Sequence, residues 1–186
     1  MPPRTRLAEV TSQRDALEQI AKLIRAGSVN GKVLQAAKAL TMDCDARDDL
    51  CEVESIFEAV KTGDSRVPGL ARGMRYVSDP RSYDTFYSAP AMLDQCRAGS
   101  CAGDCDDSTI LIGALLASLG YMVGARAWGP GRSQSDDYQH VYAVVAIPKA
   151  GPWPKDYFGH GLDVTVRKSY VGWEPANGHV MTAWID

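Results

Sequence analysis

The stretch Cys105–Trp128, CDDSTILIGALLASLGYMVGARAW, decides the fold expected for this chain. From Asp106 to Leu119 the apolar side chains recur at helical spacing, which predicts a helix with a broad apolar face. Gly120 follows the last apolar residue of that pattern and is typical of a residue that ends a helix. The next run, Tyr121–Trp128, predicts a strand. This stretch is therefore expected to be a helix with one apolar face, followed directly by a strand.

Two further strands are predicted downstream, over His140–Ile147 and Leu162–Val166. The run VYAVVAI is almost entirely apolar and rich in valine, as expected of a central buried strand. Loops rich in Gly, Pro and Ser separate the three strands. Because helices precede a run of strands, the order of elements indicates an α+β fold.

Helices are also predicted before the central helix, because apolar residues recur there at helical spacing. They cover Ala16–Ile24, Lys32–Leu40 and Asp48–Lys61. Thr11 or Ser12 would cap the first of them, and Gly27 would end it.

Two shorter helices are predicted over residues 69–77 and 91–96, and Asp79-Pro80 would stop the first of these. Because residues 1–66 contain only predicted helices and turns, we divide the chain into an N-terminal helical region, 1–66, and a core, 67–186.

Composition and charge exclude several classes of protein. The 186 residues are 45% hydrophobic and 23% charged, as in ordinary globular domains. The net charge of −3 and a pI near 5.6 indicate no nucleic-acid partner. No run approaches the ~18 apolar residues that a membrane helix needs, and the first residues lack the apolar segment of a secretory signal. We therefore expect a cytoplasmic protein without a membrane partner.

The five cysteines are Cys44, Cys51, Cys96, Cys101 and Cys105. An odd number without a secretion signal argues against a disulfide framework. We expect Cys44 and Cys51 to be buried, inert thiols. The other three leave several interpretations open: a catalytic thiol, a redox-sensitive Cys101–Cys105 disulfide, or a structural metal with His140 or Cys44 as fourth ligand.

Cys105 lies at the start of the central helix, where unsatisfied backbone N–H groups and the helix dipole favour a thiolate. The same N–H groups could stabilise an oxyanion, which suits acyl transfer. The neighbouring Asp106 and Asp107 oppose this, since like charge raises the pKa of a thiol. They are compatible with catalysis if their carboxylates pair elsewhere or a nearby imidazolium compensates.

His140 and Asp163 complete a candidate triad. His140 begins the central strand and Asp163 lies near the start of the next one, so antiparallel pairing could bring the two side chains together. Cysteine, histidine and aspartate supply the nucleophile, the base and the group that orients the base. His160 and His179 are alternative bases, interpreted first as solvated residues, and Asp156 is the alternative to Asp163.

Three segments resemble motifs of the transglutaminase-like, papain-related cysteine protease superfamily. GDCDDSTILIGALLASLGYMVGAR resembles its cysteine motif, DYQHVYAVVAIP its histidine motif, and GLDVTV its aspartate motif. The resemblance covers about Arg72 to Val166. The preceding stretch, MRYVSDPRSYDTFYSAPAML, is similar to the same region in bacteriophage and prophage members.

The resemblance implies a papain-like or transglutaminase-like core, in which a cysteine-bearing helix packs on an antiparallel sheet, with an N-terminal helical extension. Cys105 would attack a peptide or amide carbonyl and form a thioester, with His140 as base and Asp163 as orienter. The Cys105 N–H would bind the oxyanion, and Gln95 or Trp128 could assist. No cofactor is implied. Hydrolysis is favoured over calcium-dependent cross-linking, because no acidic run suggests calcium ligands.

A non-enzymatic interpretation also stands, because a fold does not determine a function. The chain would then be a structural or adaptor component of a phage particle that retains the triad by descent. Phage virion components are the partners implied in that case.

Overall fold

The computed structural model describes residues 12–78, 85–131, 138–154 and 157–185. Three helices come first: α1 (Gln13–Ser28), α2 (Gly31–Leu40) and α3 (Asp49–Lys61). The middle of the chain forms β1 (Arg75–Tyr76), α4 (Ala89–Arg97), β2 (Ala102–Gly103) and α5 (Cys105–Ser118). The last part forms β3 (Val123–Pro130), β4 (His140–Val145), β5 (His160–Leu162) and β6 (Gly178–Ile185). Helices plus an antiparallel sheet confirm the predicted α+β class.

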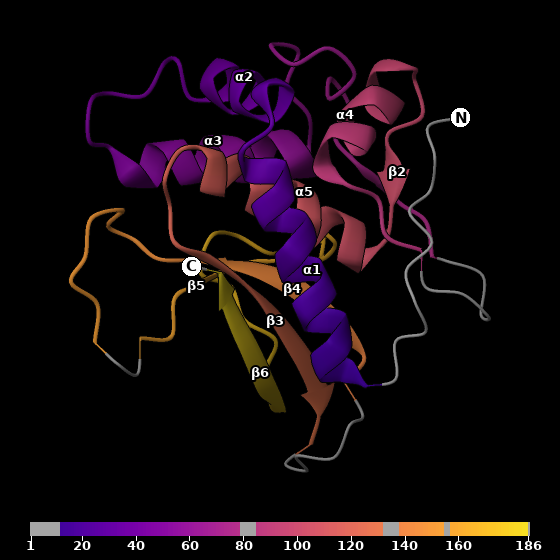
Figure 1. Cartoon of the computed structure of the whole chain (residues 1–186), viewed down its shortest axis with the longest axis vertical. Coiled ribbons are helices and arrows are strands. Elements are labelled where there is room, and N and C mark those ends of the chain that lie inside the picture. Colours follow the sequence, from indigo (N-terminus) through magenta and orange to yellow (C-terminus); the bar gives the residue numbers. More distant parts are fainter. Residues whose placement is uncertain (1–11, 79–84, 132–137, 155–156, 186) are drawn as a thin grey trace.

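Helix α5 is the centre of the molecule, packed between the other helices and the sheet (Figure 1). Ten successive residues, Asp107–Leu116, are buried, because a helix that is apolar on all sides must be covered on all sides. Helix α1 lies close against it: a Cβ added at Gly27 would come within 2.8 Å of the Ala114 Cβ. Gly27 therefore serves close helix packing, and the prediction that it ends the first helix was wrong, since α1 continues to Ser28.

The predicted boundaries of α1, α2 and α3 otherwise agree with the structure to within a few residues. Ser12 is the N-cap of α1, where its side chain accepts from the Asp15 N–H; the alternative cap, Thr11, lies outside the described residues. Asp48 caps α3 in the same way through the Cys51 N–H. The buried core draws on residues from both sides of the boundary drawn at residue 66.

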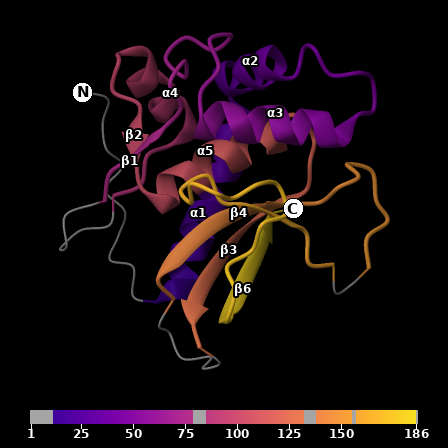
Figure 2. The ribbon, with the colours of Figure 1, turned by 180° about the vertical axis from the view of Figure 1, so that it is seen from behind.

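Four strands form an antiparallel sheet in the order β5-β4-β3-β6. Trp128 of β3 faces His140 of β4 across the ladder, and Arg126 faces Tyr142. β5 begins at His160, two residues before the predicted start, and ends at Leu162. β6 was not predicted, and it pairs along the whole of β3. Figure 2 shows the sheet below the group of helices α2, α3 and α4.

The predicted helix over residues 69–77 is wrong. The segment instead turns at Gly69 and Gly73, which both have positive φ, and then forms the short strand β1. A Cβ at Gly69 would come within 2.2 Å of the Cys96 backbone, so this segment lies tightly on α4. β1 pairs in parallel with β2, directly before Cys105. The predicted stop at Asp79-Pro80 lies outside the described residues.

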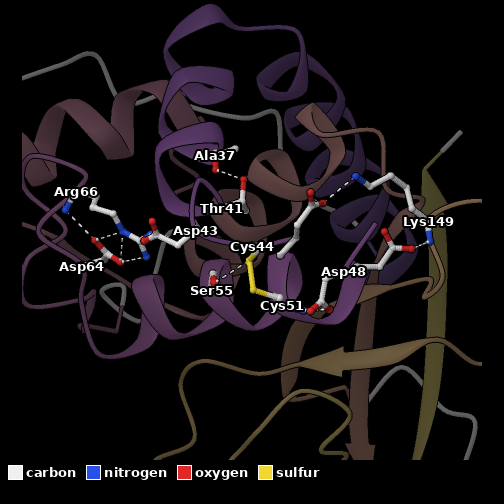
Figure 3. The surroundings of a disulfide bond; sticks show 12 residues. Ala37, Thr41, Asp43, Cys44, Asp48, Cys51, Ser55, Asp64, Arg66 and Lys149 are labelled. Atoms are coloured by element: carbon white, nitrogen blue, oxygen red, sulfur yellow. Dashed lines mark hydrogen bonds and ion pairs between the residues drawn. A yellow bond between two sulfur atoms is a disulfide. The ribbon is translucent and has the colours of Figure 1, made fainter. Parts of the chain in front are cut away.

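Four of the five cysteines form disulfides, which corrects the prediction of free thiols. Cys44 joins Cys51 across the turn between α2 and α3 (Figure 3), where the two Cα atoms lie 5.7 Å apart. Both are half-buried rather than buried. Cys96 joins Cys101, and Cys105 stays free. This pairing leaves neither a Cys101–Cys105 bond nor the three thiols of the metal alternative.

No described helix combines the length and the apolar character needed to cross a bilayer.

Candidate active site

Cys105 is the first residue of α5 and is half-buried. Asp104 caps the helix: its Oδ1 accepts from the N–H groups of Asp106 and Asp107, at 3.1 and 3.3 Å. The Cys105 sulfur accepts hydrogen bonds from the backbone N–H groups of Val141 and Asp106. Because Val141 follows His140 in β4, the thiol lies against the start of the strand that carries the candidate base.

The two acidic residues that follow Cys105 behave differently. Asp107 is buried and accepts from the Tyr87 N–H at 2.7 Å, so this carboxylate is held away from the thiol. Gly103 makes room for it, since a Cβ there would come within 2.7 Å of Asp107 Oδ2. Asp106 instead faces the sulfur, and the thiol donates to its Oδ1 across 3.8 Å.

The pKa of Cys105 is raised well above that of an ordinary thiol. Burial is the largest cause, followed by the negative charges of Asp106 and Asp104. The N–H groups of Val141 and Asp106 lower the pKa but do not outweigh these effects. The expectation that the helix N-terminus favours a resting thiolate was therefore wrong, because desolvation and two carboxylates oppose it. At neutral pH the resting Cys105 is a protonated thiol.

His140 and Asp163 are in direct contact, as predicted, but Asp163 directly follows the end of β5 rather than lying near the start of a strand. His140 Nε2 lies 2.7 Å from Asp163 Oδ2. The Asp163 side chain is fully buried, whereas that of His140 is 20% exposed. Since Nε2 is engaged by the carboxylate, Nδ1 is the nitrogen that remains for proton transfer.

Thr165 holds the other carboxylate oxygen of Asp163. Oδ1 accepts from the Thr165 N–H at 3.0 Å and from its hydroxyl at 2.7 Å, a side-chain turn typical of Asp two residues before its donor. Burial raises the pKa of Asp163, but the hydrogen bonds from His140 and Thr165 together outweigh burial and lower it. Asp163 is therefore ionised at neutral pH.

The third pair of the candidate triad is Cys105 and His140. Among the described residues no hydrogen bond joins the Cys105 thiol to the His140 ring, and the thiol donates to Asp106 instead. Catalytic hydrogen bonds are often long or misaligned before substrate binds, so this arrangement is compatible with a Cys–His pair that forms on binding.

The structure distinguishes His140 from the other histidines. His160 lies in β5, opposite Val145. His179 lies in β6, half-buried, with its ring 4.8 Å from that of Tyr138. His160 forms no carboxylate pair in the described part of the chain. Asp156, the alternative orienter, lies outside the described residues.

The two proposed helpers have different surroundings. Gln95 Nε2 donates to the Ala102 carbonyl at 3.0 Å, so it braces the loop before the nucleophile. The Trp128 Nε1 atom is buried and has no hydrogen-bond acceptor among the described residues. Trp128 faces His140 across the ladder, but its Nε1 atom packs against Gly178 of β6, where an added Cβ would come within 1.9 Å.

Sequence reasoning missed a buried ionic network next to the site. Arg126 is 1% exposed and donates to Glu174, Thr182 and the Phe158 carbonyl. Its guanidinium carbon lies 3.7 Å from the centre of the Phe158 ring. Tyr142 donates to the same Glu174, and its ring centroid lies 5.9 Å from that of His140. The sequence signal for this network was an arginine inside a predicted strand. A charged side chain that is buried in a sheet needs a partner, so Arg126 implied one.

Asp106→Asn is expected to lower the pKa of Cys105, since it removes one of the two charges that raise it. At a fixed pH below that pKa, a lower pKa means more thiolate and faster alkylation. Each unit of lowering should speed alkylation about threefold, because the weaker basicity of the thiolate offsets part of the tenfold gain. The measurement is the rate of iodoacetamide labelling from pH 7 to pH 10 without reductant.

Asp45→Asn is the matched control, because Asp45 is exposed in the loop between α2 and α3. It should leave the labelling rate unchanged. Equal or slower labelling of Asp106→Asn would contradict the role assigned to this carboxylate.

No described cluster of three or more His, Cys, Asp or Glu side chains is arranged to hold a metal ion. Comparison of this chain with protein-family models, with curated proteins and with solved structures finds no match.

Proposed function

We propose that this chain is a cysteine-nucleophile acyl-transfer enzyme with a papain-like or transglutaminase-like core. Cys105 is the nucleophile, His140 the base and Asp163 the residue that orients the base. The observation that carries the proposal is the hydrogen bond between His140 and the buried Asp163 side chain. The residue after His140 is Val141, whose backbone N–H donates to the Cys105 sulfur. The three sequence motifs that resemble the transglutaminase-like superfamily support the same assignment.

The raised pKa of Cys105 determines the order of proton transfer. Because the resting thiol is protonated, His140 Nδ1 must take the thiol proton as the sulfur attacks the substrate carbonyl. The ionised Asp163 stabilises the resulting imidazolium. The imidazolium then protonates the leaving amine as the C–N bond breaks, which leaves a thioester on Cys105.

The second half of the reaction returns the enzyme to its starting state. Water, activated by the neutral imidazole, attacks the thioester and releases a carboxylic acid and the Cys105 thiol. An amine in place of water would give a transamidation product. The candidate donor for the oxyanion is the Cys105 N–H at the start of α5.

Peptide or protein amides are the proposed substrates, and hydrolysis is proposed over transamidation. A phage-encoded, virion-associated chain remains part of the proposal, on the similarity of the segment before Cys105. The two disulfides indicate in which compartment the protein acts. Disulfides persist in oxidising surroundings and are rare in a reducing cytoplasm. They favour a place of action outside the cytoplasm over the cytoplasmic location expected from the sequence.

The direct test is a screen of peptide and glutamine-amide substrates, with and without an added primary amine. Mass spectrometry of the acid-quenched protein should detect an acyl group on Cys105, as expected for a thioester intermediate. Cys105→Ala should abolish both turnover and acylation. Release of a free acid identifies hydrolysis, and incorporation of the amine identifies transamidation. Turnover that persists in Cys105→Ala would refute the mechanism.

The second candidate is a non-enzymatic structural or adaptor protein. The observation that favours it is the protonated thiol, which donates to Asp106 and makes no hydrogen bond to His140 among the described residues. That function predicts no acylation of Cys105 and unchanged partner binding by Cys105→Ala. The same variant therefore separates the two candidates.

A further inference from the structure

Lys61, the last residue of α3, reaches across to the loop that carries Asp163. Its Nζ donates to the Ser169 backbone carbonyl, and to the Ser169 hydroxyl at 3.0 Å. The ammonium group also lies 5.1 Å from the centre of the Phe57 ring, one turn earlier in α3. Lys61 is half-buried, so these contacts form where solvent screens them incompletely.

Ser169 extends this contact to the candidate triad. It is 6% exposed, and its hydroxyl donates to the backbone carbonyl of Asp163, with the Val166 carbonyl as a second acceptor at 2.8 Å. The Lys61 ammonium donates to the Ser169 hydroxyl, and the Ser169 hydroxyl donates to the Asp163 carbonyl. The Ser169 hydroxyl therefore joins the last residue of the loop 163–169 to the first.

We propose that Lys61 is a positioning residue for the His140–Asp163 pair, acting through Ser169 and the Asp163 backbone. This inference rests on the proposed function, and it assigns part of the support of the triad to the N-terminal helical region. Thr165 fixes the Asp163 carboxylate within its own loop, whereas Lys61 fixes that loop against α3. Both are needed to hold Oδ2 within reach of Nε2.

The tests are Lys61→Met, which keeps a straight apolar side chain but removes the ammonium donor, and Ser169→Ala, which removes the hydroxyl. The first readout is the solvent-exchange rate of the His140 Nε2–H proton by ¹⁵N-edited NMR, which needs no substrate. We expect exchange to be about tenfold faster in both variants, the factor that corresponds to one lost hydrogen bond to a charged group. The double variant should show a larger effect than either single variant, because Ser169→Ala keeps the bond from Lys61 to the Ser169 backbone carbonyl.

Lys168→Met is the matched control. Lys168 is exposed and directly precedes Ser169, so its loss removes a positive charge from the same loop without removing this chain of contacts. It should leave exchange unchanged, and Lys61→Arg, which keeps a charged donor, should restore most of the protection. The second readout is turnover: Lys61→Met should lower kcat about tenfold while KM stays constant, as for a residue that touches no substrate.

Unchanged proton exchange in both Lys61→Met and Ser169→Ala would overturn the positioning role, whether or not the chain is an enzyme. Faster exchange in a chain that shows no turnover would support the positioning role while the proposed function fails. If Lys61→Met does not fold, Ser169→Ala decides the matter, because it removes only one oxygen atom.

Discussion

Replacement of His140 by alanine is expected to lower kcat/KM about a hundredfold to ten thousandfold, the range for loss of a general acid–base group. The effect should be near the upper end, because the protonated Cys105 has no other described group placed to take its proton and later give it to the leaving amine. Asp106 is a poor substitute, since a carboxylate is too weak a base for a thiol whose pKa is raised. The measurement is single-turnover acylation of Cys105.

His160→Ala is the matched control, because His160 is a half-buried histidine on the neighbouring strand β5 that makes no carboxylate pair in the described part of the chain. It should leave the acylation rate unchanged. Thermal unfolding should accompany both measurements, since His140→Ala leaves a buried carboxylate with one partner fewer, at a cost of about 1–3 kcal/mol. Acylation of His140→Ala at the wild-type rate would remove His140 from the mechanism.

Arg126→Met is expected to lower the free energy of unfolding by about 2–3 kcal/mol, less than for a fully buried ion pair, because the Glu174 side chain left behind is 26% exposed. The guanidinium is 1% exposed and satisfies three acceptors, so its loss leaves Glu174 without its cation. Tyr142 stays a neutral donor to Glu174, because burial and the carboxylate raise the pKa of its hydroxyl, so it does not replace the lost positive charge. Urea unfolding at neutral pH is the measurement.

Two variants sharpen this test. Arg72→Met removes an exposed arginine and should change the stability by less than about 0.5 kcal/mol. Arg126→Met combined with Glu174→Met should recover part of the loss, because an apolar pair of similar size avoids the uncompensated charge. A loss below about 1 kcal/mol for Arg126→Met alone would show that this network does not stabilise the fold.

Several elements could be predicted from the sequence because their signals are local. The apolar spacing in Asp107–Leu116 is sufficient to define a buried helix, and Ser12 and Asp48 mark helix starts through their own side chains. The valine-rich run after His140 identified the central strand for the same reason. Cys105 could be placed at a helix start because the apolar pattern begins just after it.

Other elements depend on contacts between distant residues and had no local signal. β6 forms because β3 offers a free edge, and its partly exposed residues lack the apolar run of a central strand. Gly69 and Gly73 turn a segment with helical spacing into a strand because that segment lies on α3 and α4. Likewise, the pairing of four cysteines depends on distances between turns, which spacing along the chain does not contain.

For the site, the sequence by itself determined which residue types were available: a cysteine at a helix start, a histidine at a strand start and an aspartate two residues before a threonine. Only the tertiary structure decided their states. Burial against β4 and the approach of Asp106 keep the Cys105 thiol protonated, because desolvation and charge depend on neighbours in space. Lys61 reaches Ser169 across 108 positions of the chain for the same reason: packing brings together groups that no sequence pattern relates.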